Sequence, residues 1–115
     1  MANMWGKERR ILKRTDFTIC YNSGVKLQSR FFIAFVCRKA DQPLSRVGFA
    51  VTKKVGNAVM RNRMKRLLRE FCRKNQEILP KSTDIVFTPK KHIKIALYTY
   101  DSLYEELCGL LKKYE

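Results

Sequence analysis

The sequence predicts a single α+β domain in which helices pack on a small sheet, in the order helix, strand, strand, helix, strand, helix. Three observations lead to this class. The length of 115 residues suits one hydrophobic core. Apolar spacing, cap residues and turn residues mark three helical and three strand-like segments. No repeat, low-complexity stretch or linker divides the chain, so we expect residues 1–115 to form one domain that opens with a basic, partly mobile segment over 1–14.

The first helix is expected over residues 16–22. Thr15 offers a hydroxyl cap, Asp16 places a favourable charge in the first turn, and Gly24 ends the helix. Phe17, within this helix, shares one face with the residue four positions later.

Two strands are expected next, over residues 30–39 and 46–54, with a turn over 41–44 between them. The first strand is almost entirely apolar, which indicates that both of its faces are covered. The second strand alternates large and small residues, and its small side is expected to let another element approach closely. The small residues are Gly48, Ala50 and Thr52, and the large ones are Val47, Phe49 and Val51. Because a short turn joins the two strands, we expect them to form an antiparallel pair.

A long helix is expected over residues 58–77, capped by Asn57 and ending before Pro80. A third strand is expected over residues 84–88. Apolar residues at helical spacing then predict a final amphipathic helix over residues 98–114. These apolar residues are Leu103, Leu107, Leu110, Leu111 and Tyr114.

Charge is the most unusual property of the chain. Twenty-five Lys and Arg residues against ten Asp and Glu residues give a formal net charge of +15. Such a chain repels itself and suits a polyanion, either nucleic acid or an anionic membrane surface. No apolar run approaches the roughly 20 residues that cross a bilayer, and no segment resembling a signal peptide follows the basic N-terminus. We therefore expect a cytoplasmic protein.

The four cysteines do not have the spacing of a metal site. Cys20, Cys37, Cys72 and Cys108 lie 17, 35 and 36 positions apart, and the only histidine is His92. A structural zinc site needs ligand pairs at closer spacing, so we expect no metal on the protein and four reduced cysteines. His92 lies among lysines and is expected at the surface or beside a phosphate.

The helix over residues 58–77 carries the main functional signal. Its apolar residues fall within an arc of about 100° and are expected to face the core. They are Met60, Met64, Leu67, Leu68 and Phe71. From Lys53 to Lys74 the chain holds nine basic residues and one acidic residue. Like charges four positions apart destabilise a helix, so phosphate binding explains this surface better than solubility does.

Aromatic residues favour RNA over duplex DNA. Phe17 and Tyr21 share a face of the first helix, Phe35 lies on the first strand, and aromatics beside a basic groove stack on unpaired bases. The alternative is that all three belong to the core. No phosphate-binding glycine loop or nucleophile motif is present, so a binder of single-stranded or structured RNA is indicated. A ribosomal or assembly protein and a DNA-binding regulator remain open; the latter would read bases chiefly with Asn62.

A close resemblance to the bacterial ribonuclease P protein subunit family lies between Lys53 and Glu70, in the run KKVGNAVMRNRMKRLLRE. This run contains the family's RNR motif as Arg61-Asn62-Arg63. Asp16-Phe17 and Gly24 are similar to the family's first helix, and residues 45–51 are similar to its RxGxxV strand. The resemblance extends over essentially the whole chain.

The resemblance implies a ribonucleoprotein endoribonuclease whose catalyst is a large RNA. This enzyme removes the 5′ leader from precursor tRNA, with Mg²⁺ held mainly by the RNA and no catalytic or metal-binding residue on the protein. The implied partners are ribonuclease P RNA and precursor tRNA, without DNA or membrane. The family also has a left-handed βαβ crossover, which differs from the general right-handed rule.

The implied site residues form two groups. Those that contact the catalytic RNA are Lys53, Lys54, Asn57, Arg61, Asn62, Arg63, Lys65, Arg66 and Arg69. Those that line a cleft for the single-stranded leader are Phe17, Tyr21 and Phe35. Arginine forks suit phosphate oxygens better than lysines do, and the free amides at a capped helix start favour an anion.

Overall fold

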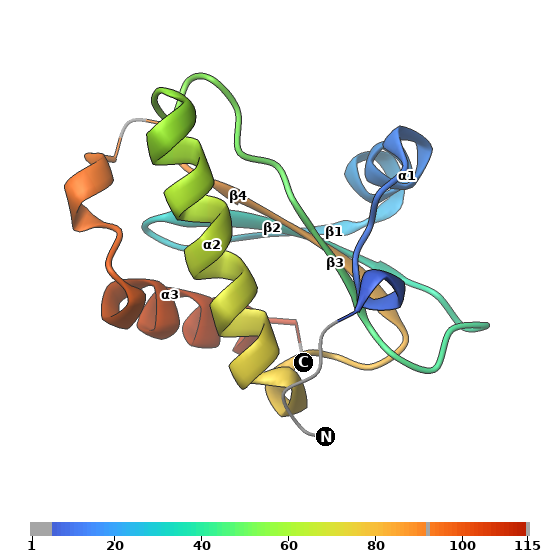
Figure 1. Cartoon of the computed structure of the whole chain (residues 1–115). Coiled ribbons are helices and arrows are strands. Elements are labelled where there is room, and N and C mark those ends of the chain that lie inside the picture. The colour runs from blue at the N-terminus through green and yellow to red at the C-terminus, as the bar shows by residue number, and fades with distance from the viewer. Residues whose placement is uncertain (1–5, 92, 115) are drawn as a thin grey trace.

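A computed structural model describes residues 6–91 and 93–114 of the chain. The described residues form a sheet of four strands in the spatial order β1-β2-β4-β3 (Figure 1). β2 pairs antiparallel with both β1 and β4, whereas β3 runs parallel to β4. The strands are β1 (Val25–Gln28), β2 (Phe32–Arg38), β3 (Arg46–Phe49) and β4 (Thr83–Pro89). His92 and residues 1–5, on which the expectation of a mobile start falls, lie outside the described residues.

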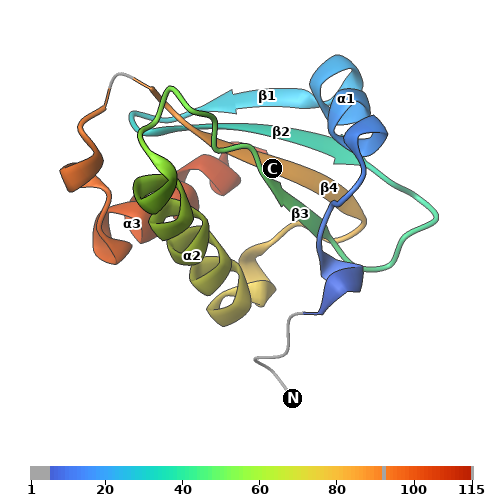
Figure 2. The ribbon, with the colours of Figure 1, turned by 45° about the horizontal axis from the view of Figure 1, so that its top comes forward.

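Helices cover the two faces of this sheet unequally (Figure 2). α1 packs on one face, mainly against β2 and β4, whereas α2 and α3 pack on the other. We call the face under α2 and α3 the closed face, and the face under α1 the open face. The helices described are α1 (Arg14–Ser23), α2 (Ala58–Lys74) and α3 (Tyr100–Lys112), with short 3-10 turns at Lys7–Arg9, Gln76–Ile78 and Ile95–Leu97.

The α+β class is confirmed, but the predicted antiparallel pairing of the second and third strands in the chain is wrong. β4 lies between β2 and β3 because it is buried at nearly every position, and a strand covered on both faces belongs in the middle of a sheet. α2 therefore joins two neighbouring parallel strands in a βαβ unit, whose hand stays a prediction. The short strand β1 is absent from the prediction, and the strand predicted over 46–54 ends at Phe49.

α1 begins earlier than predicted, at Arg14. The predicted Thr15 cap is wrong, because Lys13 occupies the N-cap position and no side chain caps this helix. Gly24 ends the helix as predicted, and its N–H donates to the carbonyl of Cys20 at 2.9 Å. A Cβ on Gly24 would lie 2.6 Å from that carbonyl oxygen, so lack of space explains the glycine.

The predicted cap of α2 is confirmed, since Oδ1 of Asn57 accepts a hydrogen bond from the backbone N–H of Met60 at 3.0 Å. The helix ends at Lys74 and not at residue 77. Asn75 departs from helical backbone angles, with φ −126° and ψ 40°, and a 3-10 turn follows.

α3 is shorter than predicted at both ends. It begins at Tyr100, where Thr99 and Ser102 form a capping box, and it ends at Lys112. Tyr98 therefore precedes the helix, and it is fully buried.

The main core lies on the closed face. Eighteen buried residues form one cluster there, whereas the buried cluster of the open face consists of Ile11, Cys20, Cys37 and Val86. Three of the predicted core residues of α2 are fully buried and Leu67 is half-buried. Met60 is the exception, because it lies in the first turn against Gly56 and remains 37% exposed.

The described part of the N-terminal segment is attached to the outer edge of β3. Arg9 is buried, and its Nε donates to the carbonyl of Ser45 at 2.8 Å. The N–H of Ile11 donates to the carbonyl of Val47 at 2.9 Å. All four cysteines are free, as expected. No helix in the described part of the chain is long and apolar enough to cross a membrane.

Candidate nucleic-acid interface

The outward surface of α2 is basic along its length. The helix carries seven Lys or Arg residues and one acidic residue, Glu70. Oε1 of Glu70 lies 2.9 Å from Nζ of Lys74, and this contact lowers the pKa of the Glu70 carboxyl. Arg66, Arg69 and Arg73 line a shallow groove beside Glu70. The only acidic group of the helix is thus already paired, which leaves most of the positive charge uncompensated.

The residues predicted to contact RNA lie on α2 and on the segment just before it. Most of them are exposed: Lys53, Lys54, Asn57, Asn62, Arg63, Arg66 and Arg69. Arg61 and Lys65 are half-buried. Nε of Arg61 is buried and has no hydrogen-bond partner among the described residues. The basic surface therefore extends from the loop before α2 to the last turn of the helix.

The two arginines of the RNR motif differ in their contacts. Nη1 of Arg63 donates to the backbone carbonyl of Tyr98 at 3.0 Å. This bond ties α2 to the segment before α3, so Arg63 supports the fold as well as the surface. Sequence spacing does not reveal the bond, because the two residues lie 35 positions apart.

On the open face, sheet register aligns one residue from each strand in a row beneath α1. The ring of Tyr21, from α1, meets the ring of Phe35 edge-on, with centroids 5.0 Å apart and planes at 79°. The row, in spatial order, is Lys26, Phe35, Val86 and Gly48.

Phe17 lies directly over Gly48 of this row. A Cβ on Gly48 would lie 2.6 Å from the Phe17 ring and 3.2 Å from Cβ of Ile11. The close approach predicted for this strand is thus confirmed, and the approaching element is α1. Phe17 and Phe35 are half-buried, and Tyr21 is 43% exposed. The structure therefore brings the three predicted cleft residues together without burying them fully in the core.

The next row of the open face, beyond α1, forms the floor of a groove of about 330 Å³. Register aligns Gln28, Ile33 and Thr88 in this row. The groove is lined by Gln28, Ile33, Thr52, Lys54, Thr88, Pro89, Lys90 and Lys91. We call the three aromatic residues together with this groove the open-face track. Lys54 belongs both to the track and to the basic surface before α2.

Sequence reasoning missed most of the groove. Its floor depends on β1, whose signal is the alternation of Val25 and Leu27 with polar neighbours. Lys90 and Lys91 reach the groove because β4 pairs with β2, and this pairing is not visible in the local sequence.

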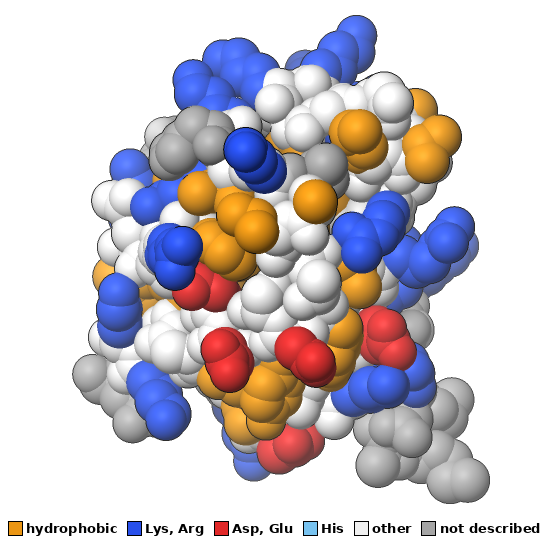
Figure 3. All heavy atoms as spheres, turned by 90° about the vertical axis from the view of Figure 1, so that its left-hand side faces the viewer, with side chains coloured by type: hydrophobic (Ala, Val, Ile, Leu, Met, Phe, Trp, Pro, Cys, Tyr) orange, Lys and Arg blue, Asp and Glu red, His pale blue; other side chains and the backbone are white. Residues whose placement is uncertain are grey.

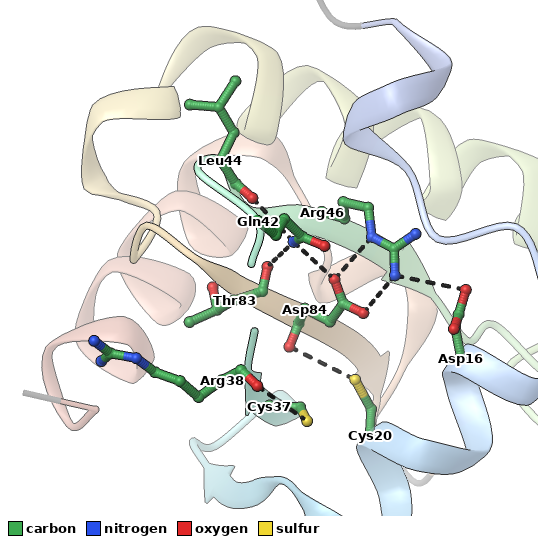
Figure 4. Close-up of polar contacts among 9 residues, drawn as sticks. All are labelled: Asp16, Cys20, Cys37, Arg38, Gln42, Leu44, Arg46, Thr83 and Asp84. Atoms are coloured by element: carbon green, nitrogen blue, oxygen red, sulfur yellow. Dashed lines mark hydrogen bonds and ion pairs between the residues drawn. The ribbon is translucent and has the colours of Figure 1, made fainter. Parts of the chain in front are cut away.

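A polar cluster fixes α1 to the strands below it (Figure 4). The Asp84 side chain is fully buried, and its Oδ2 lies 2.6 Å from Nη2 of Arg46. Its Oδ1 accepts from Nε of Arg46 at 2.9 Å and from Nε2 of Gln42 at 3.0 Å. Arg46 also lies 3.5 Å from the carboxylate of Asp16, the residue before Phe17 in α1. The cluster therefore sets the position of the aromatic end of the open-face track.

The electrostatics of this cluster favour the ionised carboxylate. Burial raises the pKa of Asp84, but hydrogen bonds from Arg46 and Gln42 and the charges of Arg46 and Lys39 outweigh it, so the pKa lies below its ordinary value. Sγ of Cys20 lies 3.6 Å from the backbone carbonyl of Asp84. The pKa of this thiol is raised to about 12, and burial is the largest cause. Cys20 is therefore a protonated thiol at neutral pH and a poor nucleophile.

Within residues 6–91 and 93–114, no group of three or more His, Cys, Asp or Glu residues could hold a metal ion. The arrangement is suited to binding an extended polyanion, because it combines exposed cations with accessible aromatic rings.

α3 has the opposite charge to α2. It carries three acidic residues and one lysine, and Asp101 and Glu105 are exposed. Figure 3, seen from the side of α3, shows acidic side chains gathered around a hydrophobic patch. A groove on this side is lined by residues that include Glu77, Ile78 and Tyr104. Because acidic groups repel a polyanion, the interface is expected on α2 and on the open face.

Comparison with known sequences identifies relatives over the whole chain. A family model described as Ribonuclease P matches residues 5–115. The ribonuclease P protein component of Desulfovibrio desulfuricans is 44% identical over 108 residues, which cover 93% of this chain and 83% of the relative. The ribonuclease P protein component of Thermotoga maritima is 34% identical, and the match covers 100% of this chain and 99% of the relative.

Comparison with solved structures gives the same result. The RNase P protein from Thermotoga maritima superimposes with a TM-score of 0.84 at 33% identity, covering 92% of this chain and 97% of that one. The RNase P protein of Staphylococcus aureus superimposes with a TM-score of 0.83 at 29% identity, covering 93% and 95%. Sequence and fold thus point to one family over nearly the full length.

Proposed function

This chain belongs to the ribonuclease P protein component family, and we propose that it binds two RNA ligands of ribonuclease P on two separate surfaces. Proteins of this family work with an RNA component, which is the first ligand and binds at α2. The second ligand is the single-stranded 5′ leader of precursor tRNA, which binds along the open-face track. Because the chain belongs to this family, we set aside the two alternative hypotheses, a ribosomal protein and a DNA-binding regulator.

The uncompensated charge of α2 supports binding of the RNA component. Seven basic residues lie on this helix, and its one acidic residue is already paired with Lys74. Binding to RNA phosphates releases condensed counterions, which stabilises the complex and makes it sensitive to salt. Arginine presents a planar fork of donors that matches phosphate oxygens, and five of the seven basic residues are arginines.

The open-face track is the observation that carries the leader proposal. Partly exposed aromatic rings lie at one end of it, and Lys54, Lys90 and Lys91 line the other. Stacking on aromatic rings tolerates any base, and lysines pair with phosphates regardless of sequence. The track is therefore suited to leaders of differing sequence.

Lys54 connects the two proposed surfaces. It lines the groove of the open-face track and lies just before α2, so the leader would run close to the RNA component. The protein thereby holds the leader in register with the RNA. Contacts made equally in the bound substrate and in the transition state lower KM more than they raise kcat.

Cleavage itself is proposed to belong to the RNA component. The described residues offer no cluster of metal-ligating side chains, so we assign no step to a metal on the protein and propose that Mg²⁺ is held mainly by the RNA. We propose the cytoplasm as the compartment, because four free cysteines suit a reducing environment.

Reconstitution with a ribonuclease P RNA tests both surfaces in one system. Replacing Arg66 and Arg69 together by Ala should weaken binding of the RNA component and reduce the salt dependence of binding by a slope of about 2. Phe17→Ala should weaken binding of precursor tRNA to the holoenzyme by about 1–3 kcal/mol, but not binding of mature tRNA.

Tyr104→Ala is a control, because it removes a partly exposed aromatic ring from α3, away from both surfaces. An equal loss of affinity for precursor and mature tRNA in the Phe17 variant would contradict the leader assignment. A wild-type protein that did not improve precursor cleavage at low Mg²⁺ would contradict the function as a whole.

A further inference from the structure

Tyr98 is the largest side chain that is fully buried in the described part of the molecule, and it is neither in a helix nor in a strand. Its single hydroxyl proton is shared between the backbone carbonyl of Phe31, 2.9 Å away, and that of Lys90, 3.1 Å away. Its ring packs against the rings of Phe31 and Phe32, with centroids 5.4 and 5.3 Å away. Burial raises the pKa of this hydroxyl to about 12, so it is a neutral donor at physiological pH.

The two carbonyls that receive this hydroxyl belong to segments that meet at the basic end of the open-face track. Lys90 directly follows β4 and lines the groove, whereas Phe31 directly precedes β2. The two segments are also bonded to each other, since the N–H of Lys90 donates to the carbonyl of Phe31 at 2.9 Å. Oε1 of Glu106, from α3, accepts from the N–H of Phe31 at 2.8 Å. The position of Lys90 thus depends on a small hydrogen-bonded cluster with the Tyr98 hydroxyl at its centre.

Tyr98 also connects this hydrogen-bonded cluster to α2. Its own backbone carbonyl accepts the hydrogen bond from Nη1 of Arg63, a residue of the RNR motif. A continuous chain of contacts therefore leads from the basic helix, through Tyr98, to the lysines at the end of the groove. Each link is a buried or partly buried hydrogen bond with a defined length, which favours one relative position of the two surfaces.

We propose that Tyr98 is a positioning residue for the precursor tRNA leader, because it holds Lys90 and Lys91 at a fixed place relative to α2. This inference depends on the leader function proposed above. Tyr98 is fully buried, so it acts through the lysines and not by touching RNA. In this proposal the aromatic end of the track lies next to the cleavage site, so only long leaders reach the lysines at the other end.

The experiment compares Tyr98→Phe with Tyr104→Phe in the reconstituted holoenzyme, using precursors whose leaders increase in length one nucleotide at a time. Tyr98→Phe retains the buried ring and removes only the hydroxyl. We expect affinity for long-leader precursors to fall about threefold to tenfold, the change expected when one neutral hydrogen bond, here shared between two carbonyls, is lost. Precursors with the shortest leaders and mature tRNA should bind as they do to wild type. Tyr104→Phe removes an exposed hydroxyl of α3 and should change neither.

A double-mutant cycle shows whether Tyr98 acts through the lysines. Lys90→Ala combined with Lys91→Ala should give the same dependence on leader length, and adding Tyr98→Phe should weaken binding no further. An additive loss would overturn the proposal. An equal loss for mature tRNA and for all precursors would also overturn it, since a purely structural defect has that effect.

The outcomes also separate this inference from the function on which it depends. If Phe17→Ala weakens binding of long-leader precursors and Tyr98→Phe does not, the positioning role is wrong and the leader function stands. If neither variant distinguishes precursor from mature tRNA, the leader function itself is wrong. Thermal melts of each variant, followed by circular dichroism, establish that every protein compared is folded.

Discussion

The two faces of the sheet differ in how they are covered, and the difference separates stability from binding. Two helices and eighteen buried residues close one face, whereas the other has a single helix and four buried residues in its cluster. Apolar burial supplies most of the free energy of folding, so the closed face is where this small domain gains its stability. The open face is left with partly exposed aromatic rings and a groove, which a ligand can occupy.

The open face remains open because α1 is held at one end of it. A buried carboxylate with an arginine partner attaches the helix on one side, and Gly48 lets Phe17 descend onto the sheet. On the open face, polar contacts and the absence of a side chain at Gly48 hold the helix on the sheet. On the closed face, apolar packing holds the helices. The two faces should therefore respond differently to substitution.

Phe71→Ala tests the stability assigned to the closed face and should have the largest effect. Phe71 is fully buried, and its replacement leaves a cavity, so we expect the free energy of unfolding to fall by about 3–5 kcal/mol. Phe35→Ala, on the open face, removes a half-buried ring and should cost about 1 kcal/mol. Urea unfolding followed by circular dichroism measures both. Similar losses for the two variants would show that the faces do not differ in the way described.

Arg46→Ala tests the polar attachment of the open face. Asp84 would keep a buried charge without its arginine partner, so we expect a loss of about 3 kcal/mol in the free energy of unfolding. The variant should also bind long-leader precursors more weakly than wild type, because Asp16 loses its contact and α1 is less firmly placed. Unchanged stability would mean that the cluster does not anchor the helix.

The same cluster predicts a dependence of stability on pH. The folded-state pKa of Asp84 lies below its ordinary value of 3.8, so its contribution is present above that value and is lost as the pH falls through the folded pKa. Asp84→Asn removes this titration. The stability difference between wild type and this variant should therefore be constant near neutral pH and shrink below about pH 4. Thermal melts over this range measure it, and a constant difference at all pH values would count against the ion pair.

Gly48→Ala tests the close approach of α1 and should cost less stability than Phe71→Ala or Arg46→Ala. The new Cβ would meet the Phe17 ring at 2.6 Å, so the ring must move, at a cost of about 1–3 kcal/mol. Leader-dependent affinity should fall with it. Gly109→Ala is the control, because nothing lies within 4 Å of its Cβ position in α3, and there we expect a gain of up to about 1 kcal/mol. A Gly48 variant as stable as wild type would show that the ring is free to shift.

Features carried by local sequence could be predicted, and those that depend on distant pairing could not. Asn57 and the basic stripe of α2 are local signals, and both lie where the sequence indicates. The i,i+4 spacing of Phe17 and Tyr21 likewise predicts their common face. In contrast, the place of β4 between β2 and β3 depends on pairings across more than 30 residues, and so do the lysines of the groove.

Three further points at which the sequence prediction falls short of the structure have separate physical reasons. Met60 follows the apolar periodicity of α2, but all three residues at the start of the helix, 58–60, are exposed, so periodicity overstates its burial. Thr15 is a good cap by residue type, but α1 extends past it to Arg14. The alternation around Gly48 predicts a close neighbour without specifying that the neighbour is Phe17.

β4, the interior strand that joins β3 to the rest of the sheet, is the last of the four strands to be synthesised. β4 spans Thr83–Pro89, and until it leaves the ribosome β3 has no strand beside it and β2 has only the short hairpin partner β1. A two-stranded hairpin alone is marginally stable in water, so a nascent chain cannot complete its fold in N-terminal stages. A chain arrested just before Thr83 would carry the whole basic helix and no finished sheet on which to pack it.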